Sequence, residues 1–471
     1  MKNFVKILIF VLLIFRIILS FKLQLHPDEA YYWLWSKNLD FSYFDHPPMV
    51  AYFIKLTTIF SNSEFFVRFS TIICYLIFNL ILYKLAKEMF NEYVGYLSLA
   101  IFNTFPANAL GFIITPDIPL MLFTILFLYF SFIALEKDKP KYWYLSGIAC
   151  GLGLLSKYNA VLLIISIFFV ILLVKEYRKF LFTKYLYLSI LISLIFFLPV
   201  VIWNYFNGWI SFRYQFFHGL PQKAGNVNNV ITYLSGQIVS LGLFLGIICL
   251  YVLIRSFFIK DKKIKFLTIF SAIPLLFFAI TSYKSLAEMN WPLCSYPALA
   301  ILTSAYLFNN EKFKKYFLYP SISFCLFLIF IIYFHGILRI LPLERFNPTW
   351  VLTDPTNWFY GWKEFAWFID EQSFEYPIFT TNHQLASELI YYSKKNLDVF
   401  HDEFQFMLWN KDKEFPKNFY FINYESDVKT PSPQQKGFTS EFLKSYDVYR
   451  KNFRIRTYNI YICVEYEHFN F

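Results

Sequence analysis

Long apolar runs separated by short polar connectors fill the first 340 residues of the chain. A helix needs about 20 apolar residues to cross the hydrocarbon core of a bilayer, and fewer where neighbouring helices shield it. The expected membrane spans are residues 4–22, 65–83, 93–112, 118–135, 142–155, 159–174, 185–203, 230–254, 266–282, 292–308 and 317–338. This pattern predicts a polytopic α-helical membrane protein with about 11 transmembrane helices.

Two places in this pattern leave a choice open. Residues 4–22 have the length of a signal peptide, but no small-residue cleavage site follows them, so we expect an uncleaved first helix. The sequence Ser156-Lys157-Tyr158, between the spans at 142–155 and 159–174, is either a turn between two helices or a kink within one.

The composition supports a membrane location and argues against a soluble globule. Of the 471 residues, 57% are hydrophobic and only 16% are charged. The net charge of +11 would also suit a nucleic-acid-binding protein, but the positions of the basic residues explain it differently. If the N-terminus faces the cytoplasm, the connectors on its side carry 19 Lys and Arg residues and those on the opposite side carry 8. We therefore expect no nucleic-acid partner.

The same topology places several polar segments on the outer side of the membrane. These are the loop at residues 23–64, the segment around Asp117, the loop at 204–229 and the C-terminal tail. We assign residues 1–340, with the loop at 23–64, to a transmembrane catalytic domain. The convergence of these loops is where we expect the chemistry.

From residue 341 onward the composition changes, because charged residues return and β-rich runs appear. The runs at 378–381, 419–424 and 453–466 favour strands, and those at 360–372 and 384–394 favour helices. Residues 425–438 have the Pro and Gly content of a loop. We predict a small α/β domain over 341–471 on the outer face.

Acidic residues and aromatic residues concentrate between His26 and Met49, directly after the first span. We expect a short interfacial helix at 28–38, begun by Pro27, that presents Asp28 and Glu29 in its first turn. These acids would serve either as helix-capping groups that interact with the helix dipole or as catalytic carboxylates. Asp117, in the sequence TPDIP, is an isolated acid at the outer end of another span, and such acids are usually functional. Asp28, Glu29 and Asp117 are therefore the candidate catalytic residues.

Asp45 and His46, in front of the double proline, form a second polar group. They are either a rigid turn with a local cap or a site that orients a phosphate. A divalent metal held by Asp45, His46 and the distant His218 is a weaker alternative, because three residues without diagnostic spacing are not specific for a metal.

Few cations lie on the outer side, so each of them is a candidate for binding an anionic headgroup. Simple membrane anchoring by snorkelling is the alternative for each one. Together with a neighbouring tyrosine and histidine, the candidate substrate- or phosphate-binding residues are Lys157, Tyr158, Arg213, His218 and Lys284.

Six ordered motifs resemble one family. HPDEAYYWLWS, YFDHPPM, ITPDIPL, SKYN, MNWP and DPTNWFYGW are similar to motifs of the bacterial members of glycosyltransferase family 39. The resemblance covers roughly residues 1–365, and the last hundred residues match only in their placement. Members are integral-membrane enzymes of the GT-C fold, related to protein O-mannosyltransferases and aminoarabinose transferases.

The resemblance implies a sugar donor carried on a polyprenyl phosphate and an active site on the periplasmic side of a bacterial inner membrane. It also implies that Asp28 is the base or acceptor-positioning residue, with Asp117 as its companion. Aminoarabinose transferases have an acid–Lys pair where this chain has Asp45-His46, and an Arg where it has Tyr31. These departures disfavour aminoarabinose as the donor sugar. The sequence DHPPM, which contains Asp45-His46, resembles the corresponding motif of members that add hexosamines or uronic acids to lipid A or lipopolysaccharide.

The function expected from the sequence is an inverting transfer of a sugar from polyprenyl phosphate to lipid A or lipopolysaccharide. Protein O-mannosyl transfer to Ser or Thr is an alternative within the same class. A transporter or flippase of lipid-linked sugars is an alternative from another class, but it would require acids at mid-membrane and paired broken helices. No Gly-rich phosphate loop occurs, which argues against direct use of a nucleotide-sugar. DPTNWFYGW either bounds an acceptor cavity or belongs to an interfacial aromatic belt.

Overall fold

A computed structural model provides the structure of the protein. It describes residues 1–219, 224–347, 349–380, 382–395, 397, 399–401, 403–411, 413–414, 416–424 and 438–465. The loop expected at 425–438 therefore falls almost entirely outside the described residues.

The chain divides into two compact units. The helical unit comprises Met1–Ser20, Leu39–Ser61 and Arg68–Tyr333. The sheet unit comprises Phe334–Phe471 together with Phe21–Asn38 and Asn62–Val67. The loop at 23–64, which we expected to belong wholly to the membrane part, is thus shared between the two units.

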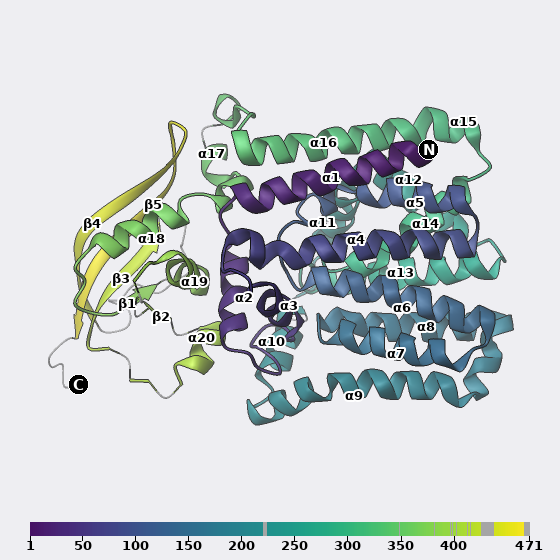
Figure 1. Ribbon diagram of the computed structural model, residues 1–471, viewed down its shortest axis with the longest axis horizontal. Coiled ribbons are helices and arrows are strands. Elements are labelled where there is room, and N and C mark those ends of the chain that lie inside the picture. The colour runs from purple at the N-terminus through teal and green to yellow at the C-terminus, as the bar shows by residue number, and fades with distance from the viewer. Residues whose placement is uncertain are drawn as a thin grey trace. The chain divides into compact units, whose positions relative to one another are not determined.

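In Figure 1 the longest helices run side by side, and among the described residues 15 helices lie wholly or mostly in the helical unit. They are α1 (Lys2–Lys22), α3 (Met49–Thr57), α4 (Glu64–Met89), α5 (Glu92–Asn103), α6 (Asp117–Lys137), α7 (Pro140–Leu154), α8 (Val161–Leu173), α9 (Lys184–Phe206), α10 (Ile210–Gly219), α11 (Val227–Ser240), α12 (Phe244–Ser256), α13 (Lys262–Ser282), α14 (Tyr296–Leu307), α15 (Glu311–Phe313) and α16 (Tyr319–Leu338). Short 3₁₀ turns lie at η1 (Pro106–Asn108), η2 (Tyr158–Ala160), η3 (Lys175–Phe182) and η4 (Leu293–Ser295), and a π-turn at η5 (Lys314–Leu318) joins α15 to α16.

Within the described residues, 6 helices are long and apolar enough to cross a membrane, or up to 8 if each of two bent pairs is one span. The protein is therefore a multi-pass membrane protein, and the number of 11 spans stays a prediction. The span expected at 230–254 is not one straight helix: α11 and α12 meet there at a bend of 110°, so the pair forms either a broken span or a re-entrant loop. Gly242 has φ +94° at the break, a left-handed conformation that ends a helix although the hydrophobic run continues.

Other expected spans are helical but shorter than the apolar run around them. Helix α5 ends at Asn103, since Pro106 follows and opens a 3₁₀ turn. Residues 155–157 and the 3₁₀ turn η2 separate α7 from α8, which makes Ser156-Lys157-Tyr158 part of a turn between two helices. Helix α14 is almost completely buried among α5, α12 and α13, so its apolar character reflects a protein core.

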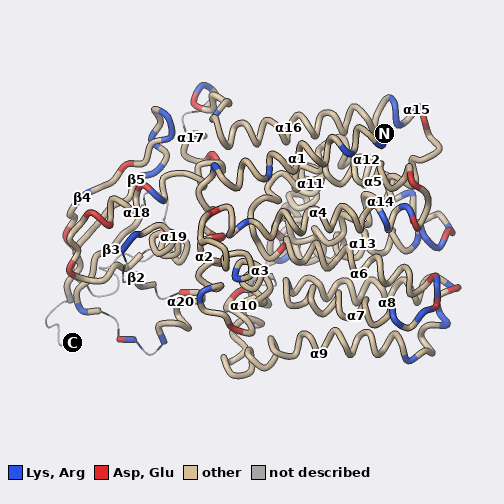
Figure 2. The backbone as a smooth tube through the Cα atoms, viewed as in Figure 1, with Lys and Arg blue, Asp and Glu red and all other residues tan. Residues whose placement is uncertain are grey.

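The distribution of charge in the helical unit follows the positive-inside pattern. Figure 2 shows Lys and Arg gathered at the end of the unit where the N-terminus lies. The connectors at 137–141, 175–184 and 255–265 supply many of them. The structure thus brings these basic connectors to one end of the unit, and the assignment of that end to the cytoplasm stays a prediction.

The sheet unit contains a five-stranded mixed sheet with the strand order β2-β1-β3-β5-β4. Its elements are α2 (Pro27–Lys37), η6 (Leu343–Arg345), α17 (Trp350–Thr353), η7 (Pro355–Phe359), α18 (Trp362–Glu371), β1 (Ile378–Thr380), α19 (His383–Tyr392), β2 (Val399–Phe400), α20 (Phe404–Trp409), β3 (Asn418–Tyr424), β4 (Phe438–Arg450) and β5 (Phe453–Glu465). Strands β1, β3 and β5 and helices α18 and α19 occur close to where the sequence predicts them. The short β2 and the long β4 were not predicted.

Alternating side chains of β3 pack on opposite faces of this sheet. Tyr420 and Ile422 pack into the core that α18 and α19 cover, whereas Phe419 and Phe421 pack on the opposite face with Phe379. This period of two is what a strand buried on both faces requires.

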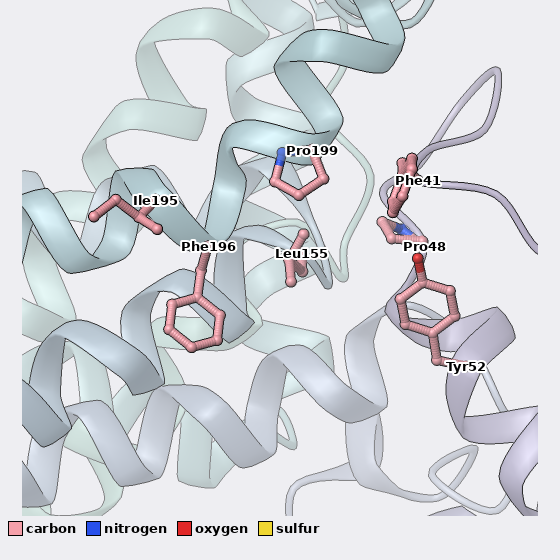
Figure 3. Close-up of a pocket in the computed structure, with 7 residues that line it drawn as sticks. All are labelled: Phe41, Pro48, Tyr52, Leu155, Ile195, Phe196 and Pro199. Atoms are coloured by element: carbon pink, nitrogen blue, oxygen red, sulfur yellow. The ribbon is translucent and has the colours of Figure 1, made fainter.

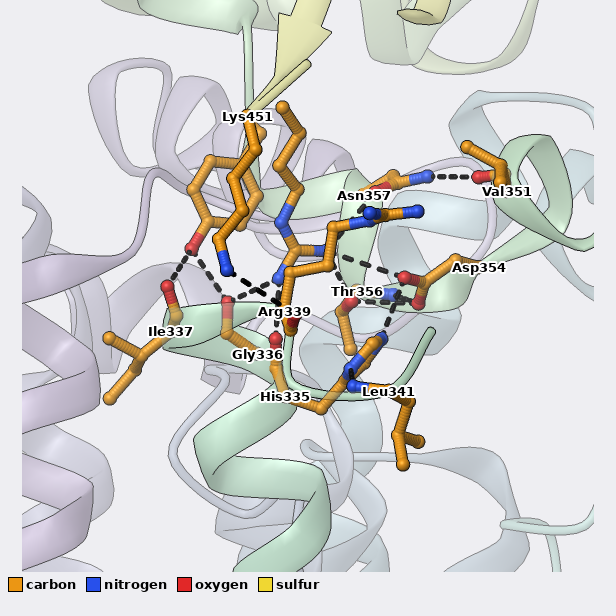
Figure 4. A network of polar contacts seen from close by, with 12 residues as sticks. His335, Gly336, Ile337, Arg339, Leu341, Val351, Asp354, Thr356, Asn357 and Lys451 are labelled. Atoms are coloured by element: carbon orange, nitrogen blue, oxygen red, sulfur yellow. Dashed lines mark hydrogen bonds and ion pairs between the residues drawn. The ribbon is translucent and has the colours of Figure 1, made fainter. Parts of the chain in front are cut away.

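A buried polar network fixes the end of α16 to the turn between β4 and β5 (Figure 4). Arg450 donates to Asn357 Oδ1 at 3.1 Å, to Thr356 Oγ1 at 2.6 Å and to the carbonyl of Gly336 at 2.8 Å. Asp354 pairs with His335 Nε2 at 2.9 Å. Burial opposes the charge of Asp354, but hydrogen bonds from His335 and Thr356 outweigh it and lower the pKa of Asp354 to about 2.

This network explains much of the DPTNWFYGW motif. Asp354, Thr356 and Asn357 surround Arg450, and Tyr360 lies under its guanidinium at 4.3 Å. Gly361 has φ +86° and packs directly against Val448, so a side chain at this position would be strained and would clash. The motif is therefore structural in large part.

Replacing Arg450 is expected to loosen the sheet unit. Arg450→Met would remove the buried cation beside Asp354 and the donor to the carbonyls of His335 and Gly336, and the free energy of opening of β4 and β5 should fall by about 3–5 kcal/mol. Amide hydrogen exchange of β4 and β5 in the purified protein measures this free energy. Arg454→Met is the matched control, because Arg454 is 49% exposed and pairs with Asp447 only at 3.8 Å. Equal effects of the two substitutions would contradict a structural role for the network.

Candidate active site

A buried ion pair lies where α6 begins. Lys157 Nζ contacts Asp117 Oδ1 at 2.8 Å, and Asn290 Nδ2 donates to Asp117 Oδ2 at 2.8 Å. The side chains of Lys157 and Asp117 are only 8% and 10% exposed. Both carboxylate oxygens are thus engaged, and we call Asp117, Lys157 and Asn290 the Asp117 centre.

Backbone and amide contacts bring the neighbouring motifs to this centre. The N–H of Met49, directly after the double proline, donates to the carbonyl of Leu155 at 3.0 Å. Asn159 donates to the carbonyl of Trp291 at 3.1 Å. The segments DHPPM, TPDIP, SKYN and MNWP are therefore contiguous within the helical unit. Of the segments expected to converge, the loop at 23–64 and the segment around Asp117 thus both reach SKYN, and their place on the outer side of the membrane stays a prediction.

Helix α10 joins the same region through the loop that carries Asp45 and His46. Gln215 donates its Nε2–H to the carbonyl of Asp45 at 2.5 Å, and the ring of Tyr214 lies 5.0 Å from that of Phe44. Burial, and then the charges of Asp45 and Glu288, raise the pKa of Tyr214 to about 12. Tyr214 is accordingly a neutral hydroxyl beside an acidic group.

An apolar cavity of about 350 Å³ opens beside these segments (Figure 3). Figure 3 shows side chains of the first loop and α3 facing those of α9 across it. The lining residues are Phe41, Pro48, Tyr52, Leu155, Ile195, Phe196 and Pro199. Because Pro48 and Leu155 also flank the contact between DHPPM and SKYN, the cavity adjoins the polar segments and suits a hydrocarbon chain.

The remaining cation candidates differ from Lys157 in their surroundings. Arg213 and Lys284 are exposed, and the described side chains do not include that of His218. Tyr158 is held by Ser211, with the two hydroxyls 2.6 Å apart. Binding of a phosphate by these residues stays a prediction, and the charge of Lys157 is already partly offset by Asp117.

The acids Asp28 and Glu29 lie in the sheet unit at the start of α2. Glu29 is fully buried and accepts the backbone N–H of His26 at 2.9 Å, while His26 accepts the N–H of Asp28, which completes a capping box. Glu29 thus makes the capping contact that we considered as the structural alternative. Asp28 is 37% exposed, and its Oδ1 accepts an N–H from Gln384 at 2.6 Å. The catalytic roles of both acids, and the partnership of Asp28 with Asp117, stay predictions.

A metal site from Asp45, His46 and His218 is likewise untested. Among the described residues no group of three or more His, Cys, Asp or Glu side chains is placed to hold a metal ion. The side chain of His218 is not among them.

Two residues at this region were missed from the sequence. Asn290 belongs to the MNWP motif, yet nothing in its local pattern marks it as the partner of a carboxylate 173 residues away. Arg16 is a lone cation inside the apolar run of α1, which was an available signal. It is 6% exposed, donates to the carbonyl of Asn108 at 3.0 Å and lies 4.3 Å over the ring of Tyr75. Arg16 therefore fixes the segment that leads to Asp117.

Sequence comparison connects the chain with membrane glycosyltransferases. Residues 45–203 match the family model of dolichyl-phosphate-mannose-protein mannosyltransferases. The lipid A galacturonosyltransferase RgtD of Rhizobium johnstonii is 24% identical over 282 residues. That alignment covers 58% of this chain and 59% of RgtD, so the chain matches less than two thirds of this relative.

Structural comparison gives the fold over nearly the whole length. ArnT from Cupriavidus metallidurans in the apo state superposes with a TM-score of 0.68 at 14% identity, covering 98% of both chains. The structure of the same protein bound to undecaprenyl phosphate gives a TM-score of 0.70 at 13% identity and the same coverage. The chain therefore has the GT-C fold of ArnT. The family model, the curated relative and the shared fold thus all connect the chain with glycosyltransferases of the GT-C type.

Proposed function

We propose that the chain transfers a sugar from a polyprenyl-phosphate carrier to lipid A or lipopolysaccharide, at the periplasmic face of a bacterial inner membrane. The observation that carries the proposal is the meeting of the DHPPM, TPDIP, SKYN and MNWP segments at a buried polar centre beside an apolar cavity. A polar centre suits a sugar phosphate, and an adjoining apolar cavity suits a prenyl chain. The likeness to a lipid A galacturonosyltransferase supports lipid A as the acceptor and a uronate as one donor sugar.

The reaction is a single displacement with inversion at the anomeric carbon. The acceptor oxygen forms a bond to this carbon while the bond to the phosphate oxygen breaks, and polyprenyl phosphate leaves with the electron pair. If the acceptor is a hydroxyl, Asp28 accepts its proton. If it is a lipid phosphate, Asp28 orients it instead. Cations that follow the charge developing on the leaving phosphate contribute most of the stabilisation, and Lys157, Arg213 and Lys284 are the candidates.

Protein O-mannosyl transfer is the second candidate, because the matching family model describes mannosyl transfer from dolichyl phosphate to protein. Lipid A remains the first choice, since the relative that acts on it aligns over 282 residues and the family model spans only 45–203.

Purified protein in liposomes distinguishes these functions. The probes are undecaprenyl phosphate carrying galacturonate, a hexosamine or mannose, each offered with lipid A or with a Ser/Thr peptide. We expect release of undecaprenyl phosphate and formation of glycosylated lipid A with one of the first two donors. Transfer of mannose to the peptide alone would overturn the proposal in favour of protein mannosylation. Movement of the donor across the bilayer without cleavage would identify a transporter.

A further inference from the structure

A side chain from the C-terminal half of the sheet unit holds the carboxylate of Asp28. Gln384, near the start of α19, donates its Nε2–H to Asp28 Oδ1 at 2.6 Å. His26 Nδ1 lies 3.6 Å from Oδ2, but this nitrogen accepts the backbone N–H of Asp28 at 3.3 Å and so has no proton to give. Among the side chains that the structure describes, Gln384 is therefore the donor to this carboxylate, and Oδ2 is left without one.

The position of Gln384 is fixed by contacts along α19. Asn382 caps the helix by accepting the N–H of Leu385 at 2.7 Å. At the other end, the hydroxyl of Tyr392 accepts the N–H of Leu25, just before α2, at 2.8 Å. Because both ends of α19 are tied down, the amide of Gln384 is pre-organised toward Asp28.

Tyr31 strengthens the same contact between α2 and α19. Its ring lies 4.5 Å from that of His383, and its hydroxyl accepts the N–H of Gln405 at 3.0 Å. Tyr31 is 1% exposed, so it acts here as a packing residue.

Burial keeps the imidazole of His383, beside Asp28, neutral at physiological pH. His383 is buried, and within the described structure its Nδ1 has no hydrogen-bond partner. Burial lowers the pKa of His383 to about 4, aided by His401 and opposed by Asp28. The titratable groups that face Asp28 are His26, just before α2, and His383, at the start of α19. The ring of His401 lies next to that of His383. A neutral amide donor orients a carboxylate without the strong charge compensation that a Lys or Arg would provide.

We infer that Gln384 is a positioning residue for Asp28. Its amide fixes Oδ1 and directs Oδ2 to the acceptor, so that the C-terminal domain completes the reacting group. This inference rests on the proposed catalytic role of Asp28 and extends it, because it gives α19 a part in the reaction.

Two substitutions of Gln384 test the inference through the pH profile of kcat/KM in the liposome assay. Gln384→Glu places a second carboxylate against Asp28, which disfavours ionisation of the pair and moves the acid limb to higher pH by about 1 unit or more. Activity at neutral pH should fall on the order of tenfold and recover as the pH rises. Gln384→Met removes the donor with little change of volume, and it should lower kcat with a smaller shift of the limb. Gln372→Glu, which adds the same charge elsewhere in the sheet unit, is the matched control.

An acid limb that stays at the wild-type position in both Gln384 variants would overturn the inference, since a purely structural role does not move it. Asp28→Asn separates this failure from failure of the proposed function. If Asp28→Asn is inactive and the limb of Gln384→Glu is unmoved, only the positioning role fails. If Asp28→Asn retains full transfer, the catalytic role of Asp28 fails and the positioning role falls with it.

Discussion

Asp28→Asn is expected to lower kcat for sugar transfer by about 100-fold or more, because a positioned carboxylate that takes up a proton contributes a factor of this order. The substitution preserves the shape of the side chain and an oxygen that accepts the N–H of Gln384. KM for the polyprenyl-phosphate donor should therefore change little. The liposome assay measures both constants.

A matched control for Asp28→Asn is Asp138→Asn. Asp138 is also partly exposed and forms an ion pair with Lys179 at 2.7 Å, in the connector between α6 and α7. It should retain wild-type transfer. A variant Asp28→Asn with wild-type kcat would remove Asp28 from the reaction.

The buried pair of Asp117 and Lys157 is the second site with a large expected effect. Lys157→Met leaves the Asp117 carboxylate buried without its cation, which costs about 3–5 kcal/mol of stability. Under the proposed function transfer should fall by about 100-fold or more, since Lys157 is a candidate to stabilise the charge of the leaving phosphate. Combining Lys157→Met with Asp117→Asn removes both charges and should regain most of the stability. Transfer should stay low in this double variant, because the functional groups are absent.

Stability and transfer of the double variant decide whether the Asp117 centre is functional. Thermal unfolding of the purified protein reports the first, and the liposome assay reports the second. Recovery of both would show that the pair is only structural. The exposed pair Asp138 and Lys179, with side chains 55% and 59% exposed, is the control, and its loss should change stability by less than about 1 kcal/mol.

Local rules in the sequence predicted several elements well. Pro27 at the first helical position and Glu29 at the third mark the start of α2, and both occupy these places in the structure. Runs rich in β-branched and aromatic residues marked β1, β3 and β5. Strand β4 was missed because charged residues interrupt it, and its pairing with β5 contains two register shifts that no local pattern reveals.

Long-range partners were beyond local patterns. The break at Gly242 lies in an uninterrupted apolar run, and hydropathy does not report backbone conformation. Asn290 and Gln384 are ordinary polar residues until the fold brings them to Asp117 and Asp28. The carboxylates themselves were identifiable because an acid at the end of an apolar helix is costly. The sequence therefore indicated the candidate acids, and the structure supplied the groups that hold them.

The central claim is that this chain adds a sugar to lipid A, and mass spectrometry of lipid A tests it most directly. Cells that lack the chain are compared with cells complemented by the wild type or by Asp28→Asn. Loss of a uronate- or hexosamine-sized mass from lipid A, restored by the wild type and not by Asp28→Asn, is the predicted result. A lipid A profile that is the same with and without the chain would contradict the claim.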